Sequence, residues 1–470
     1  MSVPARVVVN LLCAAALTLG ACATDQRADV ETYRSLSDPP GSYVVPLAGS
    51  PLSLVDALQL TARYNEQISV GGELYIQALA ARQRAAAALR PTLDLFSSTA
   101  LNENTGDGPI DQTDAGVSGQ YRLLTGLGDL RNVDAGDARI RSRRWLILDL
   151  RESLLLQTAR AYYEVLRAER LIAVLEASVQ SQLVRFEDAK ARNEVGFTRP
   201  LDVAQIEAQV SRTRAQLISA VRQGAEARST LALLTNADVS GSPLSDGFEA
   251  SGDPGDESEL WRVARTRRQD VLAARAEADA ARLLVDGAIS QFYPAVTLNL
   301  DYFLLRTPDD SPAAIAAMIE VRFPVFSAGR IEAEVRSAWS VFRQAVLEYR
   351  LRERECRRDI ETASVQLRAS LDRVIELRTQ VRVAKQALAL AEASYQAGLG
   401  TNLERITAQD QLLSAELEAA SEEFTAKFAS LALLRACGVL SSDRLGTTLP
   451  EPTEAERAPP DAPFLDRVGP

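Results

Sequence analysis

The sequence predicts an α+β protein made of two similar halves, in which long antiparallel helical hairpins are combined with two β-hairpins. Three observations lead to this expectation. Similar segments recur in the same order at offsets of about 200 residues, which is too long for a solenoid repeat of about 20–50 residues. Two very long segments lack proline and carry apolar residues at helical spacing. In each half, shorter segments alternate apolar and polar residues, as strands do.

The duplication is clearest at two glycine turns. Residues 395–404, YQAGLGTNLE, echo residues 193–202, NEVGFTRPLD. The SLALL run at 430–434 likewise echoes STLALL at 229–234. We therefore expect each half to run in one order: helix, strands, long helix, glycine turn and long helix.

The two long helices are predicted over residues 129–193 and 329–396. Each ends in a glycine turn, and partner helices are expected to return over 200–236 and 402–435. Long antiparallel hairpins of this kind pack as coiled coils. The periodicity by itself leaves open whether they enclose a conduit. In the first helix, residues stepping by three and four form the seam, namely Ala161, Val165, Ala168, Ile172, Leu175 and Val179.

A shorter helix, expected over 52–89, precedes the strands of the first half. Strands are predicted over 92–102 and 115–124, and again over 296–304 and 319–325. Strands of about 9–11 residues with one apolar and one polar face suit a membrane β-barrel. Four strands cannot close such a barrel, and lipid does not tolerate an open edge. Either several chains contribute strands, or the four form a small soluble sheet, and the pattern leaves both open.

The remaining segments connect or extend these halves. We assign 52–236 to the first repeat, 269–440 to the second and 237–268 to the connection between them. Within this connection, residues 237–259 are rich in Gly, Ser, Pro and Asp, which predicts a surface crossing. Residues 441–470 carry Pro, Asp and Glu with little periodicity, so this tail is expected to be disordered.

The first residues are expected to be a targeting segment. Residues 7–19 are apolar but too short for a spanning helix of about 20 residues, which favours a signal peptide over 1–21. The LGAC sequence that follows resembles a bacterial lipobox, in which Cys22 becomes the lipidated first residue; an ordinary secretory signal with an incidental cysteine is the alternative. In bacterial lipoproteins, a residue such as Ala23 at the next position implies the outer membrane. Residues 22–51 are then an irregular tether.

Composition excludes several other classes of function. The net charge of −11 argues against nucleic acid as a partner. The chain contains no histidine, which excludes His-dependent triads and His metal sites. After the signal segment, no apolar stretch reaches the about 18 residues of a transmembrane helix. Cys356 and Cys437 lie in helical patterns and are expected to be free and buried, although pairing stays open.

Several of these motifs together resemble a known family. The most specific are FPVFSAGR at 323–330, just before a long helix, and the two glycine turns with their following Leu-Asp and Leu-Glu pairs. Their order, their duplication and the preceding lipobox resemble the TolC-type outer-membrane efflux proteins, specifically their lipoprotein branch. The resemblance covers about residues 50–440.

The resemblance implies an assembly of three chains. Each chain would give its two β-hairpins to a single twelve-stranded transmembrane β-barrel, and the helices would continue as a periplasmic α-barrel. The connecting segments would form an equatorial belt. The glycine turns would be the periplasmic tips, where a membrane-fusion adaptor docks; plain turn chemistry is their other interpretation. The matching tip positions are Val195, Gly196, Phe197, Ala397, Gly398 and Leu399.

The resemblance also implies a gate near the tips. Tyr395 and Asp202 match two partners of a polar link that closes the tunnel at rest, and Glu404 matches an acidic ring at the constriction. The chain departs from the family at Thr407, where a second acid is expected, and at Gly400, where an arginine-based link needs a side chain. Both the ring and the lock are therefore expected to be weaker here. Solvated helix surface is the alternative for Tyr395, Asp202 and Glu404.

The function implied is that of a passive exit duct for a tripartite efflux or type I-like secretion system. Its partners would be a homotrimer of this chain, a periplasmic adaptor, an inner-membrane transporter of the RND or ABC type, and outer-membrane lipid. No cofactor is expected apart from the covalent lipid on Cys22, and no enzyme activity. The alternative is a coiled-coil envelope lipoprotein that acts only as a periplasmic spacer or adaptor. The paired strand hairpins favour the duct, because a spacer needs none.

Overall fold

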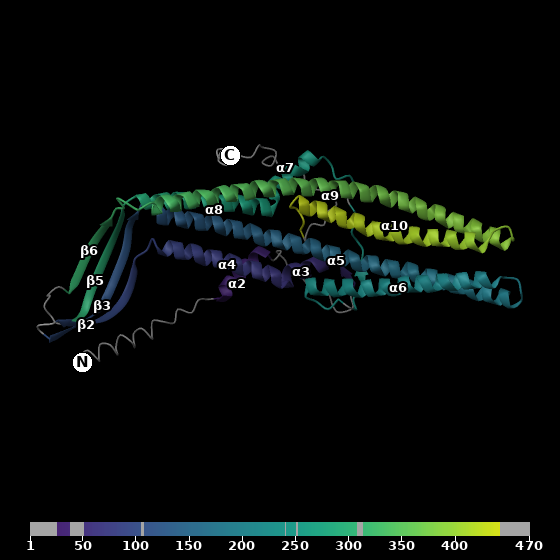
Figure 1. The fold of residues 1–470 in the computed structure, drawn as a ribbon, viewed down its shortest axis with the longest axis horizontal. Coiled ribbons are helices and arrows are strands. Elements are labelled where there is room, and N and C mark those ends of the chain that lie inside the picture. Colours follow the sequence, from purple (N-terminus) through teal and green to yellow (C-terminus); the bar gives the residue numbers. More distant parts are fainter. Residues whose placement is uncertain are drawn as a thin grey trace.

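The protein is an elongated molecule with a four-stranded sheet at one end and two helical hairpins that reach the other end (Figure 1). The signal segment, Cys22 and the tail from residue 442 lie outside the residues that the structure describes, so the predictions about them stay predictions. The computed structural model describes residues 26–37, 51–104, 108–239, 241–250, 252–307 and 314–441.

The two hairpins form as the sequence predicts. α5 (Gly128–Glu194) and α9 (Arg330–Gln396) each have 67 residues. At about 1.5 Å per residue, each is about 100 Å long. α6 (Pro200–Thr235) returns along α5, and α10 (Asn402–Ala436) returns along α9. Within the described residues, none of the helices combines the length and the apolar character needed to cross a membrane.

The hairpins are held together by the predicted apolar seam. Ala161, Val165, Ala168 and Leu175 are all buried, as the three-and-four spacing predicts. Leu175 meets residues of α6 and α10 in one small core, so the first hairpin packs on the second as well as on itself. Two shorter helices complete the bundle: α4 (Glu66–Ala87) packs against α5, and α8 (Gln269–Ile289) packs against α5 and α9.

The helix expected over 52–89 is in fact two helices. α3 (Leu54–Tyr64) ends and α4 begins at Asn65, whose backbone is extended with φ −73° and ψ 123°. The side chain of Asn65 accepts a hydrogen bond from the backbone N–H of Gln67, which caps the second helix. Asparagine competes for backbone hydrogen bonds in this way, so the prediction of one continuous helix was wrong at this residue.

The sheet joins the two halves of the chain. β2 (Thr92–Asn104) pairs with β3 (Gly108–Thr125), and β5 (Ala295–Thr307) pairs with β6 (Ile315–Arg322). β3 also pairs with β5, so the strand order is β2-β3-β5-β6 with every pair antiparallel. The predicted hairpins are therefore confirmed, and β3 starts earlier than expected. β6 ends before Phe323, because Pro324 has no N–H and disfavours continuation of the ladder.

The two faces of the sheet differ in polarity, as the alternation predicts. The register sets Asp94, Ser118 and Asp301 side by side on one face, which we call the polar face. The neighbouring positions belong to the opposite, apolar face, where Leu95, Val117, Tyr302 and Ile315 share one row.

The segment expected to be an irregular tether contains a helix. α2 (Gln26–Ser37) packs against α4 and α5. Tyr33 is buried there, over Gly72 of α4. A Cβ atom at Gly72 would lie 2.3 Å from Cδ2 of the Tyr33 ring, so the ring fills the space that the glycine leaves. The prediction missed this contact because Tyr33 has an apolar partner only in the folded protein.

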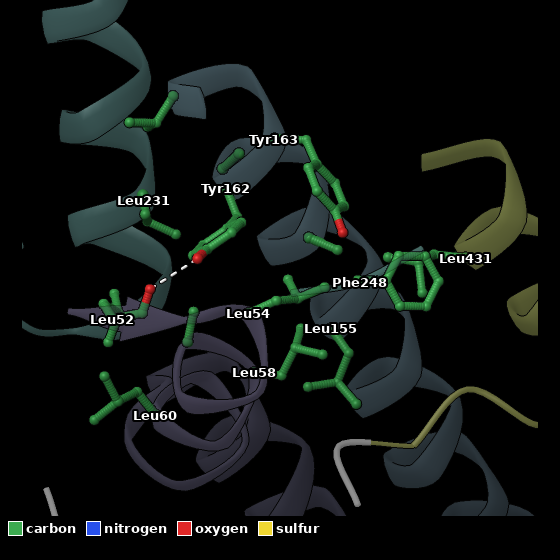
Figure 2. Close-up of a cluster of buried hydrophobic side chains, with 14 of the residues drawn as sticks. Leu52, Leu54, Leu58, Leu60, Leu155, Tyr162, Tyr163, Leu231, Phe248 and Leu431 are labelled. Atoms are coloured by element: carbon green, nitrogen blue, oxygen red, sulfur yellow. Dashed lines mark hydrogen bonds between the residues drawn. The ribbon is translucent and has the colours of Figure 1, made fainter. Parts of the chain in front are cut away.

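The connection between the repeats is also more ordered than a surface crossing. β4 (Leu244–Ser245) pairs in parallel with β1 (Leu52–Ser53), and Val239 and Phe248 are buried in the main core. Figure 2 shows the hydroxyl of Tyr162 donating to the carbonyl oxygen of Leu52, at 2.7 Å. The same hydroxyl also reaches the carbonyl oxygen of Ser245, at 2.6 Å. The connection then forms α7 (Glu257–Arg267) before α8.

A buried ion cluster links the first repeat to the second, and we call it the cross-repeat cluster. Arg435 of α10 bonds Asp149 of α5, and its Nη1 lies 3.6 Å from Oε2 of Glu152. The side-chain amide of Gln269 at the start of α8 donates to Glu152. Burial raises the pKa of Glu152 to about 7, although Arg435 opposes this shift. Burial also raises the pKa of Asp149.

A second arginine closes the cluster. Arg268, between α7 and α8, bonds Asp270 at 2.9 Å and Asp359 of α9 at 2.7 Å. The cluster thus contains charged groups from α5, α8, α9 and α10. Cys356 and Cys437 lie in the adjoining apolar core, and both are free and buried, as expected. Burial raises the pKa of Cys356 to about 11, so its thiol stays protonated.

Candidate gate and docking tips

The first tip is a glycine turn at the end of α5. Gly196 has φ 79°, in the left-handed region. Its N–H donates to the carbonyl of Asn193 at 3.0 Å, and the N–H of Phe197 donates to that of Arg192 at 2.8 Å. These bonds satisfy carbonyls that the helix end would leave unpaired. No atom lies within 4 Å of a Cβ built on Gly196, so backbone conformation alone requires glycine.

The second tip repeats this backbone. Gly398 has φ 73°, and its surroundings are equally open. The N–H of Leu399 donates to the carbonyl of Ser394 at 2.9 Å, and the N–H of Gly398 donates to that of Tyr395 at 3.1 Å. The turn chemistry predicted for both glycines is confirmed. It does not test whether the tips also bind a partner.

The tips present apolar side chains to solvent. Phe197 is 86% exposed and Leu399 is 87% exposed, at the same position after each glycine. Val195 is exposed as well, and so is Ala397 at the equivalent position of the second tip. Sequence reasoning missed two further residues of this kind. Leu201 and Leu403 lie in the first turns of the returning helices at equivalent positions and are also exposed.

The predicted gate residue Asp202 is held by a neighbour in its own turn. Its carboxylate accepts two hydrogen bonds from the guanidinium of Arg199, each 3.2 Å long. These bonds and the charge of Asp202 raise the pKa of Arg199, and Tyr395 contributes to the same shift. Arg199 is therefore the direct partner of one predicted gate residue, Asp202. Sequence reasoning missed it, although its place three residues before Asp202 on a helix start was a signal.

Tyr395 has a different direct contact. The guanidinium of Arg405 lies over its ring, 4.4 Å from the ring centre. Arg405 is buried and also donates to the side chain of Asn402 at 2.9 Å. Among the hydrogen bonds of the described residues, none joins Tyr395 to Asp202 within one chain. Their expected link stays a prediction, with Arg199 and Arg405 as the charged groups beside it.

Glu404 caps its own helix. Its carboxylate accepts the backbone N–H of Thr401 at 3.0 Å, and the hydroxyl of Thr401 accepts the N–H of Glu404 at 3.2 Å. This is a capping box. A Cβ at Gly400 would lie 3.1 Å from that of Ser394, so a side chain there would require a small shift of its neighbours. The hydroxyl of Thr407 bonds the carbonyl of Leu403 at 2.8 Å. An acidic ring at Glu404 stays untested.

The two hairpins are tied together a few turns from the tips. Arg185 of α5 donates to Glu392 of α9 and to Gln409 of α10. Gln209 of α6 donates to Asp410 of α10. Burial raises the pKa of Asp410. These bonds cross between the repeats, so nothing in the local sequence pattern predicted them.

No metal centre accompanies these polar groups in the part of the chain that the structure describes. There, no group of three or more His, Cys, Asp or Glu side chains is placed to hold an ion.

The comparison with known families identifies the class of protein. The model described as "Outer membrane efflux protein" matches residues 73–237 and 260–439. The chain belongs to the outer membrane efflux protein family, and the protein is located in the outer membrane of a Gram-negative bacterium. This family consists of channel proteins, in agreement with the resemblance that the motifs indicated.

Individual relatives are similar over most of the chain. Outer membrane efflux protein BepC of Brucella suis biovar 1 is 26% identical over 340 residues, covering 70% of this chain and 73% of that protein. Outer membrane protein TolC of Vibrio cholerae serotype O1 is 23% identical over 320 residues, covering 66% of this chain and 73% of that protein.

Solved structures share the fold. A membrane protein from Pseudomonas aeruginosa has a TM-score of 0.76 at 20% identity, covering 85% of this chain and 99% of that one. The outer membrane protein VceC from Vibrio cholerae has a TM-score of 0.72 at 22% identity, covering 82% of this chain and 96% of that one. The predicted fold class, long coiled-coil helices joined to β-hairpins with an internal repeat, is confirmed.

Proposed function

We propose that this protein is the passive, trimeric exit duct of a tripartite efflux system. The observation that carries this is the four-stranded sheet at the end of two helical hairpins, in a chain of the outer membrane efflux protein family. β2 and β6 are the edges of that sheet. Lipid does not tolerate open edges, so neighbouring chains must pair with them. Three chains close a twelve-stranded barrel, and their helices continue as an α-barrel.

The tips are the proposed docking sites for a periplasmic adaptor. Phe197 and Leu399 extend beyond the turns, with Leu201 and Leu403 beside them. Exposed apolar side chains at matching positions of two hairpins suit the apolar seam of another helical hairpin. The adaptor would connect the duct to an inner-membrane transporter of the RND or ABC type, which supplies the energy. The duct itself performs no chemistry in this proposal, so it is not an enzyme.

The proposed gate includes Arg199 as well as Tyr395, Asp202 and Glu404. Arg199 bonds Asp202 in the same turn, while Tyr395 of the other hairpin is in contact with Arg405. Charge-assisted bonds of this kind break and re-form at modest cost when they are exposed to water. An opening movement of the second hairpin would carry Tyr395 and Arg405 away from the first hairpin and leave the Arg199–Asp202 pair intact.

The proposed membrane anchor is a lipid on Cys22, on the inner side of the outer membrane. The support is the LGAC motif together with α2, which begins at Gln26 and ties the N-terminal segment to α4 through Tyr33. Mass spectrometry of the purified protein tests it. We expect acyl chains on Cys22 and none after a Cys22→Ser change; an unmodified wild-type chain would contradict the anchor.

The experiment that tests the duct is single-channel conductance in a planar bilayer, combined with the mass of the detergent-purified protein. We expect a trimer with small, cation-selective currents that rise in Tyr395→Phe or Asp202→Ala. The control is Asp188→Ala, which removes a surface pair with Arg192 near the same tip. It should leave the current unchanged. A monomer or dimer without conductance in any variant would contradict the duct and favour a non-channel spacer.

A further inference from the structure

Two phenylalanine rings meet on the polar face of the sheet. Phe96 of β2 and Phe303 of β5 lie in one row of the register, with Gly116 of β3 between them. Their ring centres are 5.8 Å apart and the rings are nearly perpendicular, at 89°. This edge-to-face geometry is favourable for aromatic pairs. In the adjoining row on this face, the residues are Asp94, Ser118 and Asp301.

Gly116 makes this contact possible. The two rings stand on strands that are not neighbours, so any side chain on the strand between them would separate the rings. A Cβ at Gly116 would also lie 2.1 Å from the carbonyl oxygen of Tyr302, so no other residue fits without a shift of β5. The register between β3 and β5 shifts at this point. The rings therefore cover a bare stretch of backbone.

An ion pair fixes the second ring. The guanidinium of Arg306 lies 3.9 Å from the centre of the Phe303 ring. Its Nε lies 3.4 Å from Oδ1 of Asp114, across the strand pair. The side chains of both ions are mostly covered, at 27% and 16% exposure. Arg306 thus contacts the Phe303 ring through a cation–π interaction, and Asp114 balances its charge.

The position of these residues along the sheet is also defined. Ala295 begins β5 at the end of the sheet that joins the helices. At about 3.3 Å per residue, Phe303 lies about 26 Å further along the strand. The apolar band of an outer-membrane barrel is about 25 Å tall, and its strands are tilted by about 35–45°. Phe303 therefore lies in the outer part of the span, far from the tips.

We propose that Phe96 and Phe303, supported by Arg306 and Asp114, form an aromatic constriction in the outer part of the barrel lumen. This rests on the proposed function: the polar face lines the lumen of a membrane barrel, and a trimer repeats the ring pair three times at one height. The constriction is in series with the tip gate. Its walls favour flat apolar or amphipathic cargo, which stacks on the rings, over hydrated ions.

The test is the conductance of Phe96→Ala/Phe303→Ala in a background that already carries Tyr395→Phe and Asp202→Ala. That background lowers the resistance of the tip, so the outer constriction limits the current. We expect the current to rise by about twofold, because conductance follows the narrowest cross-section. The matched control is Tyr302→Ala, an aromatic residue next to Phe303 but on the apolar face, which should not raise it.

A second readout tests cargo contact. Block of the outward current by an added aromatic cation, tetraphenylphosphonium, should weaken in Phe96→Ala/Phe303→Ala and persist in Tyr302→Ala. If the double alanine variant fails to assemble, Phe303→Leu keeps an apolar cover over Gly116 and should give smaller changes in the same direction.

Failure of the aromatic constriction and failure of the trimeric duct give different results. A trimer that responds to the tip changes, but whose current and block are unaffected by loss of the rings, would overturn the constriction and leave the duct intact. The rings would then serve only to pack over Gly116. If the protein is not trimeric and no variant conducts, the proposed duct itself is wrong, and the constriction that rests on it is wrong as well.

Discussion

The tips and the cross-repeat cluster use charged side chains in different ways. At the tips, each acid bonds a residue three positions earlier: Asp202 bonds Arg199, and Glu404 bonds Thr401. In the cross-repeat cluster, Arg435 bonds Asp149, which is 286 residues away in the chain. The tip bonds therefore hold a turn, whereas the cluster holds one repeat against the other.

This difference indicates which parts of the molecule can move. Both tip bonds are local: the Thr401–Glu404 bond is exposed, and the Arg199–Asp202 pair has an exposed guanidinium on a buried carboxylate. Each can therefore break without separating any packed elements. The cluster is largely buried and joins four helices, so breaking it leaves poorly solvated charges without their partners. We expect opening at the tips while the cluster stays assembled. The following changes test this contrast, from the largest expected effect to the smallest.

Arg435→Met should be the most destabilising change. It removes the guanidinium that faces the half-buried carboxylate of Asp149 and the buried carboxylate of Glu152. Loss of one partner of a buried ion pair costs about 3–5 kcal/mol. The free energy of unfolding, measured with urea in detergent, checks this. Arg357→Met, which breaks an exposed pair with Glu361, is the control and should cost less than about 1 kcal/mol. Equal losses would contradict the contrast.

The free energy of unfolding should fall as the pH rises from about 4.5 to about 7. The reason is that Glu152 binds its proton more tightly in the folded protein than in the unfolded chain. Below this window both states are protonated, and above it the stabilisation is lost. The raised pKa of Asp149 acts in the same direction. The loss from Glu152 is about 3 kcal/mol at most. Glu152→Gln stays neutral and can keep the contact with Gln269, so its stability should vary less with pH. Identical pH profiles for the two proteins would contradict this assignment.

Gly196→Ala and Gly398→Ala should lower the free energy of unfolding by the same amount. Both residues have positive φ in open surroundings, so each change adds only backbone strain of about 1–2 kcal/mol. Thermal unfolding followed by circular dichroism checks this. Gly247→Ala is the control, since that glycine is equally open and has no positive φ, and it should not destabilise the protein. A clear difference between the two tips would show that one of them has contacts beyond its turn.

Thr401→Ala and Arg199→Ala should separate stability from gating. Loss of the cap at Thr401 costs about 1 kcal/mol of unfolding free energy. Loss of Arg199, whose guanidinium is exposed, should instead raise the single-channel current, because it leaves the buried carboxylate of Asp202, a proposed gate residue, without its cation. Arg222→Ala, which breaks an exposed pair on α6, is the control and should change neither quantity. An unchanged current in Arg199→Ala would exclude Arg199 from the gate.

The sequence predicted the parts of the fold that repeat along the chain. Apolar residues at three-and-four spacing defined α5 and α10, and the glycine positions defined both tips. Alternation defined the hairpins and their two faces. At the tips, Asp202 and Glu404 were found by resemblance. Arg199 and the buried Arg405 were missed, because the local pattern does not show which residue an arginine side chain meets.

The long helices, the turns and the polarity of each strand face were determined by the sequence alone, since each follows from contacts between residues close in the chain. Only the tertiary structure decided which distant groups meet: Tyr33 over Gly72, Phe96 against Phe303 above Gly116, and Arg435 between Asp149 and Glu152. These contacts join helices and strands whose sequence patterns would also allow them to pack against other elements. Packing selects among those neighbours through shape and through the cost of burying an unpaired charge.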